Sequence, residues 1–219
     1  MRDDRPALAA TVHDRNASIL PGLRRTADDF SQTFSGFGVL ATNETSNDVV
    51  TFLRHVLNAE VVRAPANGRI GEHRRRALGL ASTLSAPTVL YSDLDHVVRW
   101  IDADRAEVKC TVSDPSADLV VIGRTRSAMT RSPDRLRATE SLVNHVYRLA
   151  TGRPWDLMFA TRLMSARAAS TVLERCVEDS IGSDVEWPVV VEQAGLSISY
   201  LEAEALSYRT IDDFGSTAD

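Results

Sequence analysis

The stretch Thr88-Val-Leu-Tyr-Ser-Asp-Leu-Asp-His96 is the starting point for interpreting this chain. Its first four residues form a short apolar run, which predicts a buried strand. Two carboxylates separated by one residue, Asp93 and Asp95, follow directly in the predicted turn that leaves this strand. Ligands of open α/β sheets bind beyond the carboxyl ends of the strands, so the position favours a binding role for this acidic pair.

Three units of a short apolar run followed by a helical pattern precede this stretch. We predict strands at 8–12, 37–42 and 60–63, and helices at 18–30, 47–57 and 71–84. With the run at 88–91 as a fourth strand, this alternation predicts an α/β fold. The expected architecture is a Rossmann-like, mostly parallel central sheet with helices on both faces.

The alternation continues beyond the acidic pair. We predict helices at 97–108, 133–149, 167–177 and 185–194, and strands at 119–123, 157–164 and 198–201. The tail after Asp213 is predicted to be loose. No repeat or low-complexity linker interrupts the chain, so we predict a single domain over residues 1–219.

Composition excludes several classes of protein. The net charge of −5 argues against a nucleic-acid binder, because phosphate neutralisation needs clustered cations. The chain has no apolar run of the roughly 18 residues that a transmembrane segment needs, and its charged start is not a signal peptide. Cys110 and Cys176 lack metal-ligand spacing and are predicted to be small core residues in a reducing compartment. We therefore expect a cytoplasmic protein.

The chemistry of the acidic pair indicates a divalent metal. Asp93 and Asp95 can both reach one hard cation such as Mn²⁺ or Mg²⁺, which would neutralise a diphosphate leaving group. A chance triplet is the alternative, because Asp102-Ala103-Asp104 has the same spacing. That second triplet falls in a predicted helix, where it is expected to form a solvated face. Two carboxylates at the end of a buried strand need a partner, so we favour the metal at Asp93 and Asp95.

An acidic pair after three strand–helix units and a fourth strand resembles the GT-A nucleotide-diphospho-sugar transferases, in particular the family-2-like glycosyltransferases. The resemblance covers roughly residues 7–210 as a pattern. It implies a GT-A-like domain with a nucleotide-binding half at about 7–95 and an acceptor-side half at about 96–212. It also implies Mn²⁺ or Mg²⁺ bound by the acidic pair.

Three segments on the donor side contribute to the resemblance. Ala9–Asn16 is a strand that runs into a polar turn, Leu40–Ser46 ends the second strand, and Asn67–Ala81 is a glycine followed by a basic helix. The resemblance implies nucleotide binding by Thr11, His13, Asp14, Arg15, Glu44, Gly71, Arg75 and Asp93. Ordinary helix capping in the first segment and solvated arginines in the third are the alternatives.

The acceptor side of the resemblance lies in Trp155–Ser165 and Gly182–Pro188. In the family an acid in this region deprotonates the acceptor hydroxyl. The candidate catalytic acids are therefore Asp184, Glu186 and Asp156, and the candidate acceptor-binding residues are Arg124 and Trp155. Capping of the helix that follows residue 184 is the alternative reading of these acids.

The resemblance implies a metal-dependent, inverting glycosyltransferase. It would move a sugar from a nucleotide-diphosphate-sugar donor to the hydroxyl of a small-molecule or lipid-linked acceptor. A catalytically inactive GT-A-like module that binds a nucleotide or a partner protein is the main alternative. A nucleotidyltransferase is less favoured, because no glycine-rich loop follows the first strand. Assembly as a homodimer is left open.

Overall fold

The computed structural model describes residues 4–113 and 115–207, so the predicted loose tail after Asp213 lies outside the described residues. The strands are β1 (Ala7–Val12), β2 (Gly36–Thr42), β3 (Glu60–Ala64), β4 (Thr88–Tyr91), β5 (Leu119–Arg124), β6 (Thr161–Ser165) and β7 (Ile198–Ala203). The helices are α1 (Leu20–Thr33), α2 (Asn47–His55), α3 (Ile70–Ser82), α4 (Leu94–Ser113), α5 (Arg126–Thr130), α6 (Asp134–Thr151), α7 (Ala166–Arg175) and α8 (Ser183–Gln193).

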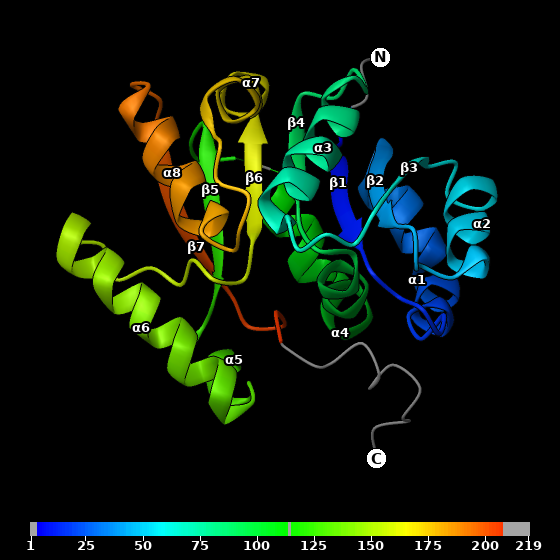
Figure 1. Cartoon of the computed structure of the whole chain (residues 1–219), viewed down its shortest axis with the longest axis horizontal. Coiled ribbons are helices and arrows are strands. Elements are labelled where there is room, and N and C mark those ends of the chain that lie inside the picture. Colours follow the sequence, from blue (N-terminus) through cyan, green and yellow to red (C-terminus); the bar gives the residue numbers. More distant parts are fainter. Residues whose placement is uncertain (1–3, 114, 208–219) are drawn as a thin grey trace.

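The strands form one sheet in the order β3-β2-β1-β4-β6-β5-β7 (Figure 1). Every neighbouring pair is parallel except those that include β6, which runs antiparallel to both β4 and β5. The mostly parallel sheet predicted from the sequence is confirmed. Because β1 and β4 are adjacent and parallel, their carboxyl ends bring Thr11 and Asp93 to the same edge of the sheet.

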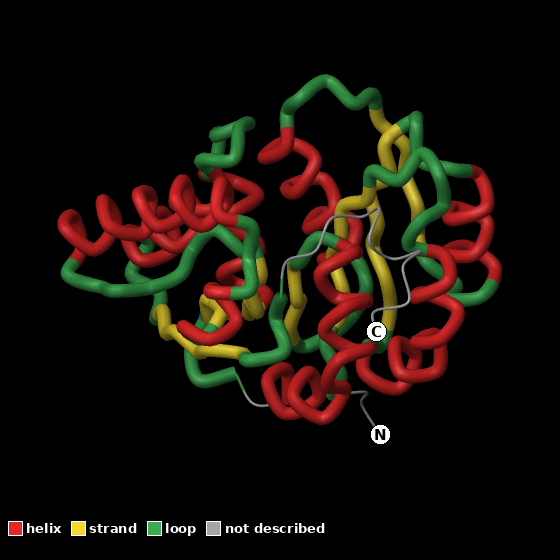
Figure 2. Tube along the Cα trace, turned by 90° about the horizontal axis from the view of Figure 1, so that it is seen from below, coloured by secondary structure: helices red, strands yellow, loops and turns green. Residues whose placement is uncertain are grey.

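Helices cover both faces of the sheet, so successive residues of its central strands are buried (Figures 1 and 2). In β1, Leu8 and Ala10 belong to a core that also holds side chains of α1, α2 and α4. The intervening Ala7 and Ala9 belong to a second core with α3, α7 and α8. Each fully buried Leu or Phe contributes roughly 1.5–3 kcal/mol, so the two cores together fix the sheet between its helices.

Helix α3 approaches the sheet closely at Gly38 of β2. A Cβ at this position would lie 2.4 Å from the backbone nitrogen of Ala81, so only glycine leaves room for the helix. The close packing fixes the axis of α3 across β1 and β2. Its first turns therefore stand beside the end of β4, which is where the acidic pair lies.

Three predictions about local structure differ from what is observed, and one short helix was not predicted. The predicted strand at 157–164 begins only at Thr161, and Ala160 before it has a φ of 52°. The buried apolar side chains of this loop gave it the hydrophobicity of a strand. Helix α4 begins earlier than predicted, at Leu94, and α5 was not predicted. Cys110 is exposed, whereas Cys176 is buried as expected.

No helix within the described part of the chain has the length and apolarity to cross a membrane.

Candidate functional site

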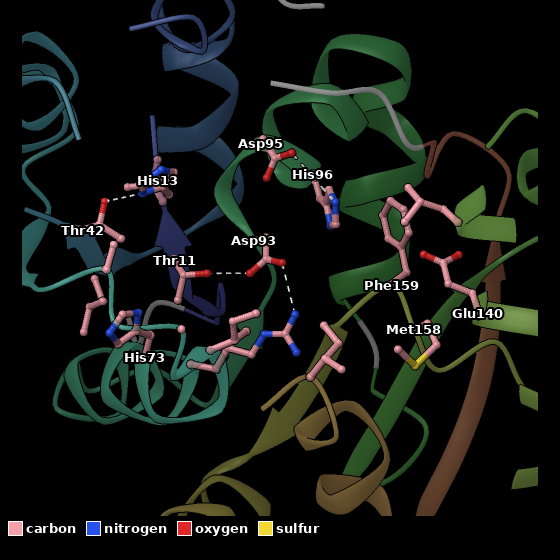
Figure 3. Close-up of a pocket in the computed structure, with 18 residues that line it drawn as sticks. Thr11, His13, Thr42, His73, Asp93, Asp95, His96, Glu140, Met158 and Phe159 are labelled. Carbon is pink, nitrogen blue, oxygen red and sulfur yellow. Dashed lines mark hydrogen bonds and ion pairs between the residues drawn. The ribbon is translucent and has the colours of Figure 1, made fainter. Parts of the chain in front are cut away.

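A cavity of about 630 Å³ opens beyond the carboxyl ends of β1, β2 and β4 (Figure 3). The predicted site residues that line it are Thr11, His13, Asp93 and Asp95. Both carboxylates of the acidic pair therefore belong to one cavity, as expected for residues at the end of a central strand. The Asp102–Asp104 triplet is remote from this cavity, and Asp102 forms an exposed ion pair with Arg25.

Asp93 is held in a fixed orientation by its neighbours. Its Oδ1 accepts hydrogen bonds from the hydroxyls of Thr11 at 2.6 Å and Tyr91 at 2.8 Å, and its Oδ2 lies 3.4 Å from Nη2 of Arg74. Burial alone would raise the pKa of Asp93, but the charge of Arg74 and these hydrogen bonds outweigh it and hold the pKa below its ordinary value. The site therefore presents an ionised carboxylate whose position is set.

Asp95 stands in the first turn of α4, beside His96. Burial and the charge of Asp93 raise the pKa of Asp95, against the opposing influence of His96, whose Nε2 is 3.9 Å from Oδ2. The imidazole of His96 stacks on the ring of Phe159, with centroids 4.1 Å apart. A divalent cation would stabilise the charged form of Asp95 that its surroundings disfavour.

An arginine of α3 connects the acidic pair to α8. Nη1 of Arg74 lies 2.7 Å from Oδ1 of Asp184, and the two side chains are 4% and 3% exposed. Burial would lower the pKa of Arg74, but Asp184 and Asp93 together raise it, so the guanidinium stays charged. The predicted catalytic acid Asp184 thus lies in a buried ion pair outside the lining of the cavity.

The predicted nucleotide-binding residues Gly71 and Arg75 do not line the cavity. Successive residues of a helix point about 100° apart, so Arg74 faces the cavity and Arg75 pairs with Asp179 instead. The amide of Gly71 donates a hydrogen bond of 2.8 Å to the carbonyl of Asp179, and a Cβ here would lie 2.0 Å from the carbonyl oxygen of Glu178. Both residues hold α3 against the segment before α8.

Three other residues predicted to bind the nucleotide lie away from the cavity lining. The carboxylate of Asp14 accepts hydrogen bonds from the backbone amides of Ser18 and Ile19, at 3.0 and 2.9 Å, at the start of α1. Asp14 therefore stabilises the turn that leads into α1, whereas no side chain caps the helix itself. Arg15 and Glu44 are exposed.

The remaining acceptor-side residues, Arg124, Asp156 and Trp155, lie behind the cavity wall that Glu140 lines. Nε of Arg124 lies 2.8 Å from Oδ2 of Asp156, and Nη2 lies 2.6 Å from Oε2 of Glu140. Trp155 stacks on Tyr200, with centroids 5.5 Å apart. None of Arg124, Asp156 and Trp155 lines the cavity.

The remaining predicted catalytic acid, Glu186, also has a local structural role. Its carboxylate accepts hydrogen bonds from the backbone amides of Val177 and Glu178, at 2.9 and 3.1 Å. It is absent from the cavity lining. The helix-capping alternative does not describe these contacts, because the amides belong to the segment before α8 and no side chain caps that helix.

Several residues that the sequence analysis did not select do line the cavity. They are Thr42, His73, Arg74, Glu140, Met158 and Phe159. Among these, Thr42 is 2.8 Å from Nδ1 of His13, and Glu140 reaches in from α6. Burial raises the pKa of Glu140 against the opposing charge of Arg124. The one sequence signal for Glu140 was its place one turn after Leu136, on the inward stripe of α6.

The part of the chain that the structure describes holds no ready-made site of three protein ligands at the acidic pair. Within residues 4–113 and 115–207, no group of three or more His, Cys, Asp or Glu side chains is arranged to hold a metal ion. Two carboxylates still suit Mg²⁺ or Mn²⁺, which are commonly bound through one or two carboxylates together with substrate phosphates and water.

The fold is the GT-A fold, as comparison with solved structures shows. Solved structures of glucosyl-3-phosphoglycerate synthase from Mycobacterium tuberculosis cover 97% of the chain. The complex with Mn²⁺, UDP-glucose and phosphoglyceric acid has 13% identity and a TM-score of 0.60 over 75% of that chain. The complex with Mg²⁺ and UDP has 15% identity and a TM-score of 0.58 over 74% of that chain. No protein-family model and no curated protein sequence matches.

Proposed function

We propose that the chain is a metal-dependent glycosyltransferase that uses a nucleotide-diphosphate-sugar donor. One observation carries the proposal: Asp93 and Asp95 line a single cavity at the carboxyl ends of the central strands of a GT-A fold. The structures of the M. tuberculosis synthase, whose fold is similar, contain Mn²⁺ or Mg²⁺ with UDP or UDP-glucose. The cations suit the two carboxylates of this cavity, and a bound cation would in turn hold the diphosphate.

In this proposal Asp93 and Asp95 hold Mn²⁺ or Mg²⁺. The bound cation would supply electrostatic stabilisation of the diphosphate leaving group. Thr11 and Tyr91 keep the carboxylate of Asp93 in place through their hydrogen bonds. Arg74 adds a positive charge 3.4 Å from Asp93, on the cavity wall where the diphosphate would lie.

The nucleoside of the donor is proposed to lie at the end of the cavity that β1 and β2 form. His13 and Thr42 are the polar side chains there, linked to each other at 2.8 Å. Glu44, which the resemblance placed against the base, is exposed and outside the lining. His13 and Thr42 are therefore better placed than Glu44 to donate to or accept from a base.

The proposed transfer step joins the acceptor oxygen to the anomeric carbon of the sugar. The bond from that carbon to the diphosphate oxygen breaks, and its electron pair leaves with the nucleoside diphosphate. The hydroxyl proton passes to a carboxylate, for which Glu140 is the candidate, because it lines the cavity and burial raises its pKa. In-line attack with inversion remains part of the proposal.

Asp184 is the second candidate for the base. It would reach the cavity only if its ion pair with Arg74 opened, because both side chains are buried in that pair. Asp156 and Glu186 are assigned structural roles in this proposal, given their contacts away from the cavity. The division into halves near residue 95, the cytoplasmic location, the homodimer and the lipid-linked acceptor remain predictions from the sequence.

The test is product formation. The protein is incubated with Mn²⁺, UDP-glucose or a GDP-sugar and a mixture of hydroxyl acceptors, and the products are separated and identified by mass spectrometry. The proposal expects a glycosylated product together with released nucleoside diphosphate, both lost in Asp95→Asn. Donor binding without any transfer would favour the inactive binding module. The absence of both binding and transfer would reject the GT-A site altogether.

A further inference from the structure

The cavity has two ends that differ in chemistry. In Figure 3, His13 and Thr42 lie on one side of Asp93, and Met158, Phe159 and Glu140 lie on the other. The first side comes from β1, β2 and the loops after them, which is the side proposed for the nucleoside. The second side comes from α6 and the loop before β6. It is the end left for the acceptor, and it is called the acceptor end below.

Positive charge is scarce around this cavity. Among the described residues that line it, Arg74 is the only lysine or arginine, and its guanidinium already contacts Asp184 and Asp93. Three carboxylates face the same space, from Asp93, Asp95 and Glu140. The divalent cation that holds the diphosphate would occupy Asp93 and Asp95, so Glu140 is the carboxylate left to face the acceptor.

Arg124, the cation nearest to Glu140, is also engaged. Its side chain is fully buried and is bound by Glu140 at 2.6 Å and Asp156 at 2.8 Å. Its guanidinium carbon lies 4.7 Å from the centroid of Phe159, on whose ring it stacks. Arg124 therefore lies behind the cavity wall, and its guanidinium N–H groups are not available to an anionic ligand.

Most of the other described side chains of the acceptor end are apolar. They are those of Leu136, Met158 and Phe159, and the imidazole of His96 stacks on the ring of Phe159. An acceptor phosphate placed among them would lose its water without gaining a lysine or arginine from the described lining, and would meet the carboxylate of Glu140. An alkyl or aryl group would instead bury its surface against the thioether of Met158 and the ring of Phe159.

We propose that the acceptor is an uncharged hydroxyl compound with an apolar group, and not a phosphorylated acid. The proposal rests on the function proposed above and narrows its acceptor. The hydroxyl faces Glu140 and the apolar group packs on Met158 and Phe159. This differs from phosphoglyceric acid, which is bound in the M. tuberculosis synthase structure.

Two small probes that differ only in this feature test the proposal. Glycerol monobutyl ether and glycerol 3-phosphate are titrated separately into the protein saturated with UDP and Mn²⁺, and binding is followed by ligand-observed NMR. The expected result is that the butyl ether binds at least about tenfold more tightly than the phosphate. Equal binding, tighter binding of the phosphate, or binding of neither probe would overturn the proposal.

A charge substitution provides the second measurement. Met158→Lys places a cation at the acceptor end, so it is expected to weaken the butyl ether and strengthen glycerol 3-phosphate, each by about tenfold. Val146→Lys adds the same charge on the exposed side of α6 and should change neither value. If Met158→Lys left both affinities unchanged, the acceptor would not contact this end and the inference would be wrong.

The two proposals fail in different ways. If UDP does not bind in a Mn²⁺-dependent manner, the proposed function itself is contradicted before any acceptor is added. If UDP binds with Mn²⁺ and transfer occurs only to phosphorylated acids, the glycosyltransferase proposal stands and only the acceptor class is wrong.

Discussion

Arg74 and Asp184 form an ion pair of 2.7 Å in which both side chains are almost completely buried. The same guanidinium lies 3.4 Å from Asp93, so one arginine joins α3, the start of α8 and the end of β4. A buried pair is expensive to break because the partner that remains is a desolvated charge. The position of the acidic pair is thereby coupled to the packing of two helices on the same face of the sheet.

Asp184→Ala should destabilise the protein by about 3 kcal/mol or more, because it leaves Arg74 buried with Asp93 as its only carboxylate partner. Urea unfolding at pH 7 measures the change. Asp102→Ala is the control, since its pair with Arg25 is exposed and should cost less than about 1 kcal/mol. Similar losses in the two variants would show that the buried pair has no special role in stability.

Glu140→Gln should lower kcat by about 10²–10⁴-fold and leave the affinity for UDP and Mn²⁺ unchanged, if Glu140 takes the acceptor proton. Burial raises the pKa of Glu140 above its ordinary value of 4.5. A base must be deprotonated to act, so kcat of the unmodified protein should fall as the pH drops through that raised pKa.

Variants separate Glu140 from the alternative base Asp184, because burial raises the pKa of both carboxyls. Glu192→Gln is the control, because it removes only a partly exposed partner of Arg153. In this variant kcat and its fall at low pH should both be unchanged. An unaltered kcat in Glu140→Gln would exclude this residue as the base. Loss of kcat in a folded Asp184→Asn variant would then point to Asp184.

The two cysteines should differ sharply in reactivity. Burial, together with Glu186, raises the pKa of Cys176 to about 12, so at pH 8 almost none of this buried thiol is thiolate. Cys110 is exposed. With a thiol reagent at pH 8 one equivalent should react rapidly in the native protein, none in Cys110→Ser, and a second only after denaturation. Rapid labelling of native Cys110→Ser would contradict the burial of Cys176.

The order of elements was predictable because the apolar runs and helical patterns of this chain are strong. The fourth strand was placed at its observed bounds, and Ser46 caps α2 through the amide of Asp48 as its sequence position indicates. The antiparallel insertion of β6 was not predicted. Strand direction depends on how the chain returns to the sheet. The chain returns through the buried loop at 157–160, whose apolar residues resemble part of a strand in the sequence.

The site was predictable only where backbone position alone determines it. Asp93 and Asp95 follow a central strand, so the sheet brings them to the cavity. The choice between Arg74 and Arg75 depended on how α3 is rotated about its axis, which the run of three arginines does not reveal. Glu140 comes from a helix far along the chain, and its approach to His96 and Phe159 depends on the placement of α6.

The most direct measurement is the affinity for UDP with and without Mn²⁺, by calorimetry, in the unmodified protein and in Asp95→Asn. The account predicts that Mn²⁺ tightens UDP binding by at least about tenfold, and that Asp95→Asn removes this gain without unfolding the protein. Asp102→Asn, on the exposed triplet, should keep the gain in full. Equal UDP affinity with and without the metal, or an undiminished metal effect in Asp95→Asn, would contradict the claim that this acidic pair binds the cation.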